Sequence, residues 1–330
     1  MDAKELHKNA IVFDGLNICN WSRDIFEDMR RGGVTGVNCT CSTWENFPDT
    51  MKNVIQWKGW FDEHSDIIVQ AYTTEDIRRA KVDGKTAIVL GWQNTSAIED
   101  QIGYLRIFKE LGVGIMQLTY NTQNLSGAGV WERVDPGLSD WGREVVDEMN
   151  RLGIMCDLSH VGPQTVADTI AASKKPVCFS HTLPAGMKES PRNKTDEQLK
   201  AIADRGGLIG LMLFGPMMKR GNDSTIDDYV ETLDYVINIT GEDQVCIGTD
   251  FSQGHARPSA FQEYAQRDKG YARFTTQFLH AEVKHPEGFR TIGEFPNLAA
   301  AMQRAGWSDA KIVKVLGENW LRVLKEVWGG

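Results

Sequence analysis

The sequence predicts an α/β fold in which eight parallel strands, each followed by helix, close into a single (β/α)₈ barrel. Short apolar runs rich in β-branched residues alternate with amphipathic segments along the chain, which is typical of strands covered by helices on both faces. A length of 330 residues suits one large barrel. The eight runs are Ile11–Asn17, Val34–Cys41, Thr86–Trp92, Gly114–Tyr120, Gly153–Ser159, Pro176–His181, Leu208–Phe214 and Gln244–Asp250.

The segments between these runs carry the start and stop signals of helices. Several begin with Ser or Thr followed closely by acidic residues, which is typical of a helix N-terminus. These starts lie at Thr74, Ser139, Thr195 and Ser224. A doubly wound open sheet is the structural alternative, but no glycine-rich nucleotide loop follows the first run. Strands that alternate with helices in this way are therefore interpreted as a closed parallel barrel.

One domain over residues 1–330 is the simplest interpretation, because no repeat, low-complexity tract or linker interrupts the alternation. The long polar segment at about 252–297 is expected to form a loop after the eighth strand, a suitable place for a lid or a dimer contact. A C-terminal helical pair is expected to follow it.

Composition and charge exclude several classes of protein. The formal net charge of −9 argues against a nucleic-acid partner, which normally requires a basic face. No secretory signal and no run of membrane-spanning length is visible, so a cytoplasmic protein without a membrane partner is expected. The cysteines lie mostly in apolar strand-like runs and are interpreted as reduced core thiols. They are Cys19, Cys39, Cys41, Cys156, Cys178 and Cys246.

Polar side chains stand at the ends of four predicted strands: Tyr120, His160, His181 and Asp250. The carboxyl ends of barrel strands meet at one mouth, so these side chains are expected to share a site. Neutral imidazole suits zinc, and a carboxylate supplies a ligand or a base. The pattern predicts either a metal site or a set of hydrogen-bonded structural residues. A nucleophile elbow and a phosphate-binding loop are both absent from the sequence.

Several motifs then resemble one known family. The stretch from Gly137 to His160 is similar to the membrane (renal) dipeptidase family, peptidase family M19, as are Pro176–His181, Pro191-Arg192-Asn193, Ile247–Phe251 and Gly317-Glu318-Asn319. The resemblance runs from about residue 10 to the C-terminus. It implies a metal-dependent, amidohydrolase-like barrel that is usually a homodimer, carries a pair of zinc ions and hydrolyses dipeptides, including some with a D-residue at the C-terminal side.

The resemblance also implies roles for individual residues. His160 and His181 would hold the second metal of the family's pair. Arg192, followed by Asn193, would bind the substrate carboxylate, a role that suits the planar fork of a guanidinium. Asp250 would shuttle the proton.

The chain departs from the family's pattern at four positions. Leu16 and Ile18 stand where the family has the His and Asp that hold the first metal, and both lie on one face of the strand. Gln93 replaces the Glu that bridges the metals, and a neutral amide is a poor bridge between two cations. Tyr120 replaces a substrate-contacting His and is expected to bind substrate and donate a hydrogen bond to the developing oxyanion.

These observations leave two hypotheses. The first is a dipeptidase-like hydrolase that cleaves a dipeptide or another small carboxylate-bearing amide, with one zinc on His160 and His181 and with Gln93 as a further candidate ligand. The second is a non-catalytic or metal-free descendant that binds a small molecule, which the aliphatic residues 16 and 18 favour. An enzyme with altered C–N bond chemistry is a variant of the first, since fold does not fix function.

Overall fold

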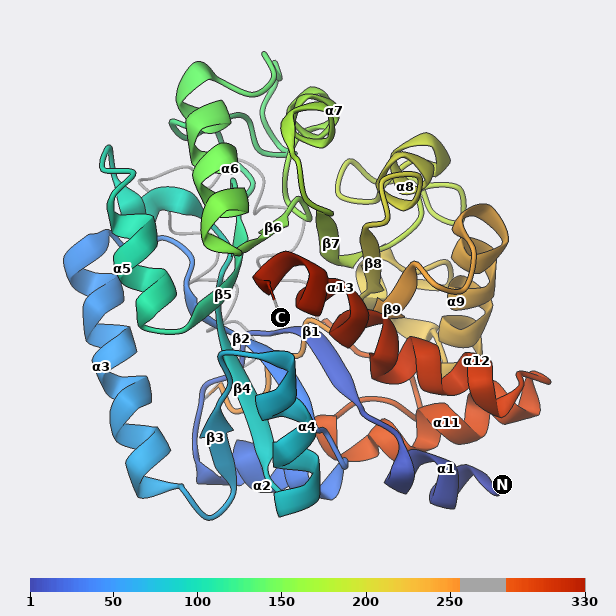
Figure 1. The fold of residues 1–330 in the computed structure, drawn as a ribbon. Coiled ribbons are helices and arrows are strands. Elements are labelled where there is room, and N and C mark those ends of the chain that lie inside the picture. The colour runs from blue at the N-terminus through green and yellow to red at the C-terminus, as the bar shows by residue number, and fades with distance from the viewer. Residues whose placement is uncertain (256–282, 330) are drawn as a thin grey trace.

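The computed structural model describes residues 1–255 and 283–329, and its strands form a barrel surrounded by helices (Figure 1). Eight parallel strands follow one another around it in chain order, which confirms the predicted (β/α)₈ class. Each predicted run overlaps one of them. They are β1 (Phe13–Asn17), β2 (Gly36–Ser42), β4 (Thr86–Trp92), β5 (Val113–Gln117), β6 (Met155–Asp157), β7 (Cys178–Thr182), β8 (Leu208–Leu211) and β9 (Val245–Ile247).

A further short strand, β3 (Ile68–Gln70), was not predicted from the sequence. It pairs in parallel with β4, with Ile68 opposite Thr86, and lies off the path of the barrel. Only its first residue is fully buried. A run of three residues with two half-exposed positions is too short to give a periodic signal.

Helices of the described chain surround the strands, and their capping follows the sequence signals closely. Ser139 caps α6 and Thr195 caps α8 as predicted, whereas the caps of α4 and α9 are Thr73 and Thr225, one residue from the predicted starts. The helices are α1 (Ala3–Asn9), α2 (Arg23–Arg31), α3 (Phe47–Glu63), α4 (Thr74–Asp83), α5 (Tyr104–Glu110), α6 (Asp140–Leu152), α7 (Pro163–Ala172), α8 (Asp196–Ala203), α9 (Ile226–Thr240), α11 (Phe295–Arg304), α12 (Asp309–Val313) and α13 (Asn319–Trp328).

Contacts between the first and last strands close the barrel. Asn17 bridges to Phe251 in parallel, and the Ile18 N–H donates to the Phe251 carbonyl at 2.8 Å. The buried carboxylate of Asp14 accepts hydrogen bonds from both the N–H (2.8 Å) and the hydroxyl (2.6 Å) of Thr249. These bonds join the two edges of the sheet, so no strand edge is left open there.

The hydrophobic core has an outer and an inner part. The larger cluster fills the layer between strands and helices, and a second cluster takes residues from β1, β4, β5, β6, β7, β8 and β9 together with Trp320 of α13. The Trp320 ring is fully buried, lies 5.4 Å from the Phe13 ring and donates through Nε1 to the Ile247 carbonyl. A Cβ on Gly15 would lie 2.4 Å from this ring, so only glycine fits there.

The predicted segment 252–297 is described only in part, because residues 256–282 lie outside the described residues. From residue 283 the chain is irregular up to the short 3₁₀ helix η6 (Ile292–Glu294), and α11 begins at Phe295. A π-helical turn, η7 (Lys314–Glu318), then joins α12 to α13. None of the helices in the described ranges has the length and apolarity to cross a membrane. All six cysteines are buried free thiols, as predicted.

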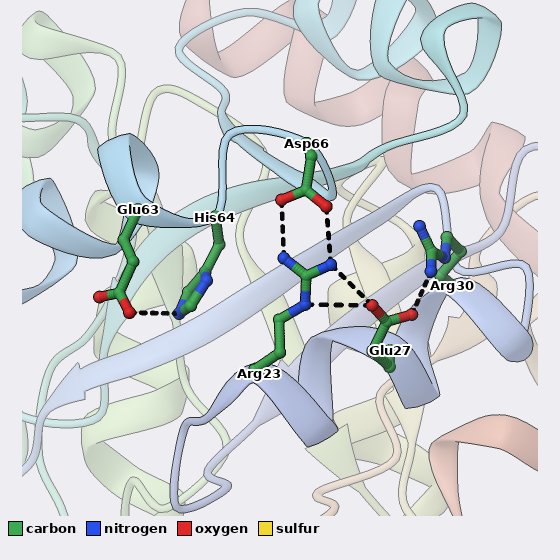
Figure 2. A network of polar contacts seen from close by, with 6 residues as sticks. All are labelled: Arg23, Glu27, Arg30, Glu63, His64 and Asp66. Carbon is green, nitrogen blue, oxygen red and sulfur yellow. Dashed lines mark hydrogen bonds and ion pairs between the residues drawn. The ribbon is translucent and has the colours of Figure 1, made fainter.

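Figure 2 shows a polar network on the outer surface that ties α2 to the chain after α3. Arg23 donates to both carboxylate oxygens of Asp66 (2.7 and 2.6 Å) and also to Glu27. These side chains are largely exposed, so the ion pairs add little to stability.

Candidate active site

The two predicted histidines converge at the carboxyl ends of neighbouring strands. His160 follows β6 and His181 lies in β7, and their Nε2 atoms are 2.9 Å apart. Both rings are buried, at 8% and 0% exposure. The barrel topology thus brings together side chains that are 21 residues apart in the sequence.

The other ring nitrogen of each histidine has its own partner. His160 Nδ1 lies 2.6 Å from Asn121 Oδ1, which can only accept, so this nitrogen carries the proton. His181 Nδ1 lies 2.8 Å from Ser180 Oγ, whose hydroxyl proton is already donated to Asp157 Oδ2 at 2.6 Å. His181 Nδ1 is therefore also a donor. The hydrogen-bond network assigns an unprotonated Nε2 to both neutral rings.

The electrostatic surroundings keep both rings neutral. Burial lowers the pKa of His160 and of His181 well below the ordinary value, and the charge of Arg192 lowers each further. Two nitrogen lone pairs then face each other at 2.9 Å, an arrangement that is repulsive unless a cation that binds both nitrogens lies beside them. Histidine ligands of metals are oriented in the same manner, by a hydrogen bond at the second ring nitrogen.

The donor set fits one metal ion better than two. In the described ranges, no group of three or more His, Cys, Asp or Glu side chains is placed to hold a metal. The two imidazoles supply half of a four-coordinate zinc shell. Gln93 is buried and donates through Nε2 to Thr40 Oγ1 at 3.0 Å, which leaves its amide oxygen as the only atom able to bind a cation. The residues therefore do not fit a two-zinc centre.

Leu16 and Ile18 make the opposite side of the mouth apolar. They are 1% and 6% exposed, yet neither belongs to the two hydrophobic clusters of the core. An aliphatic side chain has no lone pair to offer a cation. Neither side chain can therefore hold a metal at this side of the mouth.

Tyr120 forms an aromatic wall beside the histidines. Its ring stacks on His160 with centroids 4.2 Å apart, and Trp44 meets it edge-on at 4.9 Å. Burial raises the pKa of the phenol well above its ordinary value, so the hydroxyl stays protonated and can donate a hydrogen bond.

Arg192 is a buried cation with an unused donor. Only 2% of the residue is exposed, and Nη2 donates to the His181 carbonyl at 2.8 Å, whereas Nη1 is buried with no partner among the described residues. An unpaired buried guanidinium nitrogen is costly, and the carboxylate of a ligand would satisfy it. The side-chain amide of Asn193 does not take part in this arrangement. It donates to the carbonyls of Lys188 and Met217 and so links the loop after β7 to the segment after β8.

Asp250 lies at the end of the last strand in a strained conformation. Its φ of 59° is left-handed, and burial raises the pKa of its carboxyl to about 7, against the opposing influence of Arg192. Backbone strain of this kind is concentrated at functional sites. A carboxyl that titrates near neutral pH suits a general acid and base.

Comparison with known proteins assigns the chain to a family. The family model for membrane dipeptidase (peptidase family M19) matches residues 24–275 and 274–328. The chain belongs to the membrane dipeptidase family. It is therefore a member of a family of dipeptidase-like hydrolases. The matched residues begin after β1, so Leu16 in that strand and Ile18 just beyond it lie outside the match.

Individual relatives of this M19 chain agree with the assignment. Dipeptidase tcpJ of Claviceps purpurea (strain 20.1) is 29% identical over 283 residues, which are 84% of this chain and 60% of the relative, so the chain spans under two thirds of that protein. A crystal structure of an amidohydrolase from Pseudomonas aeruginosa is 54% identical with a TM-score of 0.96, over 100% of both chains. A metallo peptidase from Rhodobacter sphaeroides, liganded with a phosphinate mimic of the dipeptide L-Ala-D-Ala, has a TM-score of 0.81 at 21% identity, over 97% of this chain and 100% of that one.

Three residues that orient the histidines of the candidate site were missed in the sequence. Ser180 and Asp157 hold His181, and Asn121 holds His160. A signal was available for the first two. The dipeptide Ser-His occurs twice, as Ser159-His160 after β6 and as Ser180-His181 in β7, and the hydroxyl groups of both serines donate to Asp157. Asn121 gives no such signal, since it reaches His160 only through a left-handed backbone with φ 62°.

Proposed function

We propose that this chain hydrolyses a dipeptide or a small carboxylate-bearing amide at the barrel mouth, using one divalent cation on His160 and His181. The observation that carries the proposal is the 2.9 Å approach of the two Nε2 atoms, together with the hydrogen-bond partner that holds the second nitrogen of each ring. Zinc is the cation that this imidazole pair suits, and the amide oxygen of Gln93 is a further candidate ligand. When bound, zinc would lower the pKa of a water molecule and polarise the scissile carbonyl.

The chain's own residues supply the remaining steps. Arg192 binds the substrate carboxylate through Nη1, which fixes the position of the peptide bond relative to the histidines. Asp250 accepts the proton of the attacking water and returns it to the leaving amine, a task that suits a pKa of about 7. The Tyr120 hydroxyl donates to the oxygen that gains charge in the transition state.

A second candidate function has its own supporting observation. The apolar side chains of Leu16 and Ile18, buried at the mouth, favour a descendant that binds a small carboxylate ligand without hydrolysing it. In that case Arg192 would keep its role and Asp250 would have none.

Metal content combined with hydrolysis tests the proposal. We would measure zinc by mass spectrometry in protein purified without chelator, and hydrolysis of Leu-D-Ala and Leu-L-Ala after zinc addition. The variants are the double substitution His160→Ala/His181→Ala and, as a matched control, His64→Gln at the C-terminal end of α3. Wild type and control should hold about one zinc per chain, and the double variant should lose it together with at least about 100-fold in kcat/KM.

Three other outcomes would contradict this assignment. About two zinc ions per chain would show that residues 16, 18 and 93 do not abolish the first metal position. Full hydrolysis in the double variant would remove the histidines from the reaction. Tight binding of the dipeptide without turnover would favour the non-catalytic candidate.

A further inference from the structure

A separate pocket opens between the ends of β1 and β2 and the helix α3. Its volume is about 280 Å³. Pockets that enclose a whole ligand usually measure roughly 300–1,000 Å³, so this one suits a part of a ligand such as one side chain. Its apolar lining consists of Ile18, Cys19, Trp21, Cys41, Trp57 and Trp60. We call it the tryptophan pocket.

Aromatic rings give this pocket a fixed shape. Trp57 is 2% exposed and packs between two neighbours, with ring centroids 5.1 Å from Trp21 and 5.0 Å from Trp60. The Trp57 and Trp60 rings meet edge to face at 89°. Interlocked rings of this kind form walls that lose little freedom when a ligand enters.

The thiols in the walls behave as apolar groups. Cys41 is 5% exposed, and burial raises the pKa of its thiol to about 12. Burial likewise raises the pKa of the Cys19 thiol well above its ordinary value. Both thiols therefore stay uncharged at neutral pH and are poor nucleophiles, so the pocket binds rather than reacts.

The tryptophan pocket shares residues with the barrel mouth. Ile18 belongs to the apolar face that replaces the first metal position, and Thr40 lines the pocket while its hydroxyl accepts a hydrogen bond from Gln93. In the strand order, β1 and β2 lie four strands away from β6 and β7, which is directly across the barrel. A substrate whose carboxylate is bound at Arg192 after β7 therefore extends its other end toward β1 and β2.

We propose that the tryptophan pocket receives an apolar side chain on the amino-terminal residue of the substrate. The proposal rests on the proposed function and names its substrate class: dipeptides with a bulky aliphatic or aromatic first residue. An acidic first residue is disfavoured, because Glu45 also lines the pocket and its carboxylate is held there by the N–H groups of Thr43 and Trp44.

The test compares dipeptides that differ only in the first residue. We would measure kcat/KM of the zinc-loaded full chain with Gly-D-Ala, Leu-D-Ala, Phe-D-Ala and Glu-D-Ala. Leu and Phe should exceed Gly by at least about 10-fold, and Glu should not exceed Gly. Two variants, Ile18→Asn and Trp60→Ala, should reduce the Leu-to-Gly ratio below about 3-fold. Trp141→Ala on α6, outside the pocket, is the matched control and should keep the ratio.

The outcomes separate this inference from the proposed function. Two results would contradict the role of the tryptophan pocket while leaving hydrolysis established. One is an equal kcat/KM for Gly-D-Ala and Leu-D-Ala in wild type, and the other is a Leu-to-Gly ratio of kcat/KM that both pocket variants retain. If no dipeptide is hydrolysed, the proposed function fails, and calorimetry with phosphinate analogues of Gly-D-Ala and Leu-D-Ala decides on the pocket. Tighter binding of the Leu analogue supports it, and equal binding overturns it.

Discussion

Replacing Ser180 with alanine isolates the hydrogen bond that sets the tautomer of His181. The hydroxyl accepts from His181 Nδ1 at 2.8 Å and donates to Asp157 Oδ2 at 2.6 Å. In Ser180→Ala the ring N–H is buried without a partner, which costs about 1–3 kcal/mol, and the carboxylate loses one charge-assisted bond worth about 1.5–3 kcal/mol. The free energy of unfolding should therefore fall by roughly 2.5–6 kcal/mol. Zinc affinity should fall by roughly 10- to 100-fold, since the ring is no longer oriented.

Ser159→Ala is the matched control for this substitution. Ser159 also donates to Asp157 at 2.6 Å and accepts from the His181 backbone N–H at 3.1 Å, but it does not contact the Nδ1 atom of either histidine. Its removal should destabilise the fold by a similar amount, yet keep zinc affinity within about 3-fold. Competition with a zinc chelator gives the affinity, and urea unfolding of the metal-free protein gives the stability. An equal loss of zinc affinity in both variants would refute the assigned role of Ser180.

Three further predictions follow from the site and the core. Arg192→Met should raise KM for dipeptides by roughly 10- to 100-fold, because a charge-assisted hydrogen bond worth about 1.5–3 kcal/mol is lost, and an unchanged KM would exclude carboxylate binding there. Burial raises the pKa of Asp250 to about 7, so the carboxyl is protonated below that pH and kcat/KM should fall about tenfold per pH unit on the acid side; a profile unchanged in Asp250→Asn would contradict its role as base. Trp320→Ala should lower the free energy of unfolding by about 3–5 kcal/mol in urea titrations, whereas a loss below about 1 kcal/mol would mean that the ring does not fill the barrel.

The sequence was most informative where a residue's position along a strand decides its place in space. Strand-end histidines and Asp250 could be located because parallel strands present their carboxyl ends at one mouth. The substituted residues 16 and 18 were equally visible, since residue type alone excludes a metal ligand. In both cases the barrel fold determines where in space a residue lies once its position along a strand is known.

The sequence was uninformative where a contact depends on loop conformation or on packing between distant segments. Asn121 reaches His160 because its backbone is left-handed, which no pattern of residue types predicts for an asparagine after a tyrosine. Trp57 and Trp60 have helical spacing and look like an ordinary core stripe. Their role as pocket walls depends on Trp21, which comes from the loop after β1.

The position of Trp320 in the barrel has a consequence for the order of events during synthesis. The inner cluster combines residues of the first strand, such as Phe13, with the side chain of Trp320, which lies some 300 residues later. When a ribosome has synthesised all eight strands, Trp320 has not yet been added to the chain. The barrel interior therefore stays unfilled after the eight strands have been made, so chaperones would meet a nascent chain whose first-strand apolar residues remain uncovered until Trp320 has been synthesised.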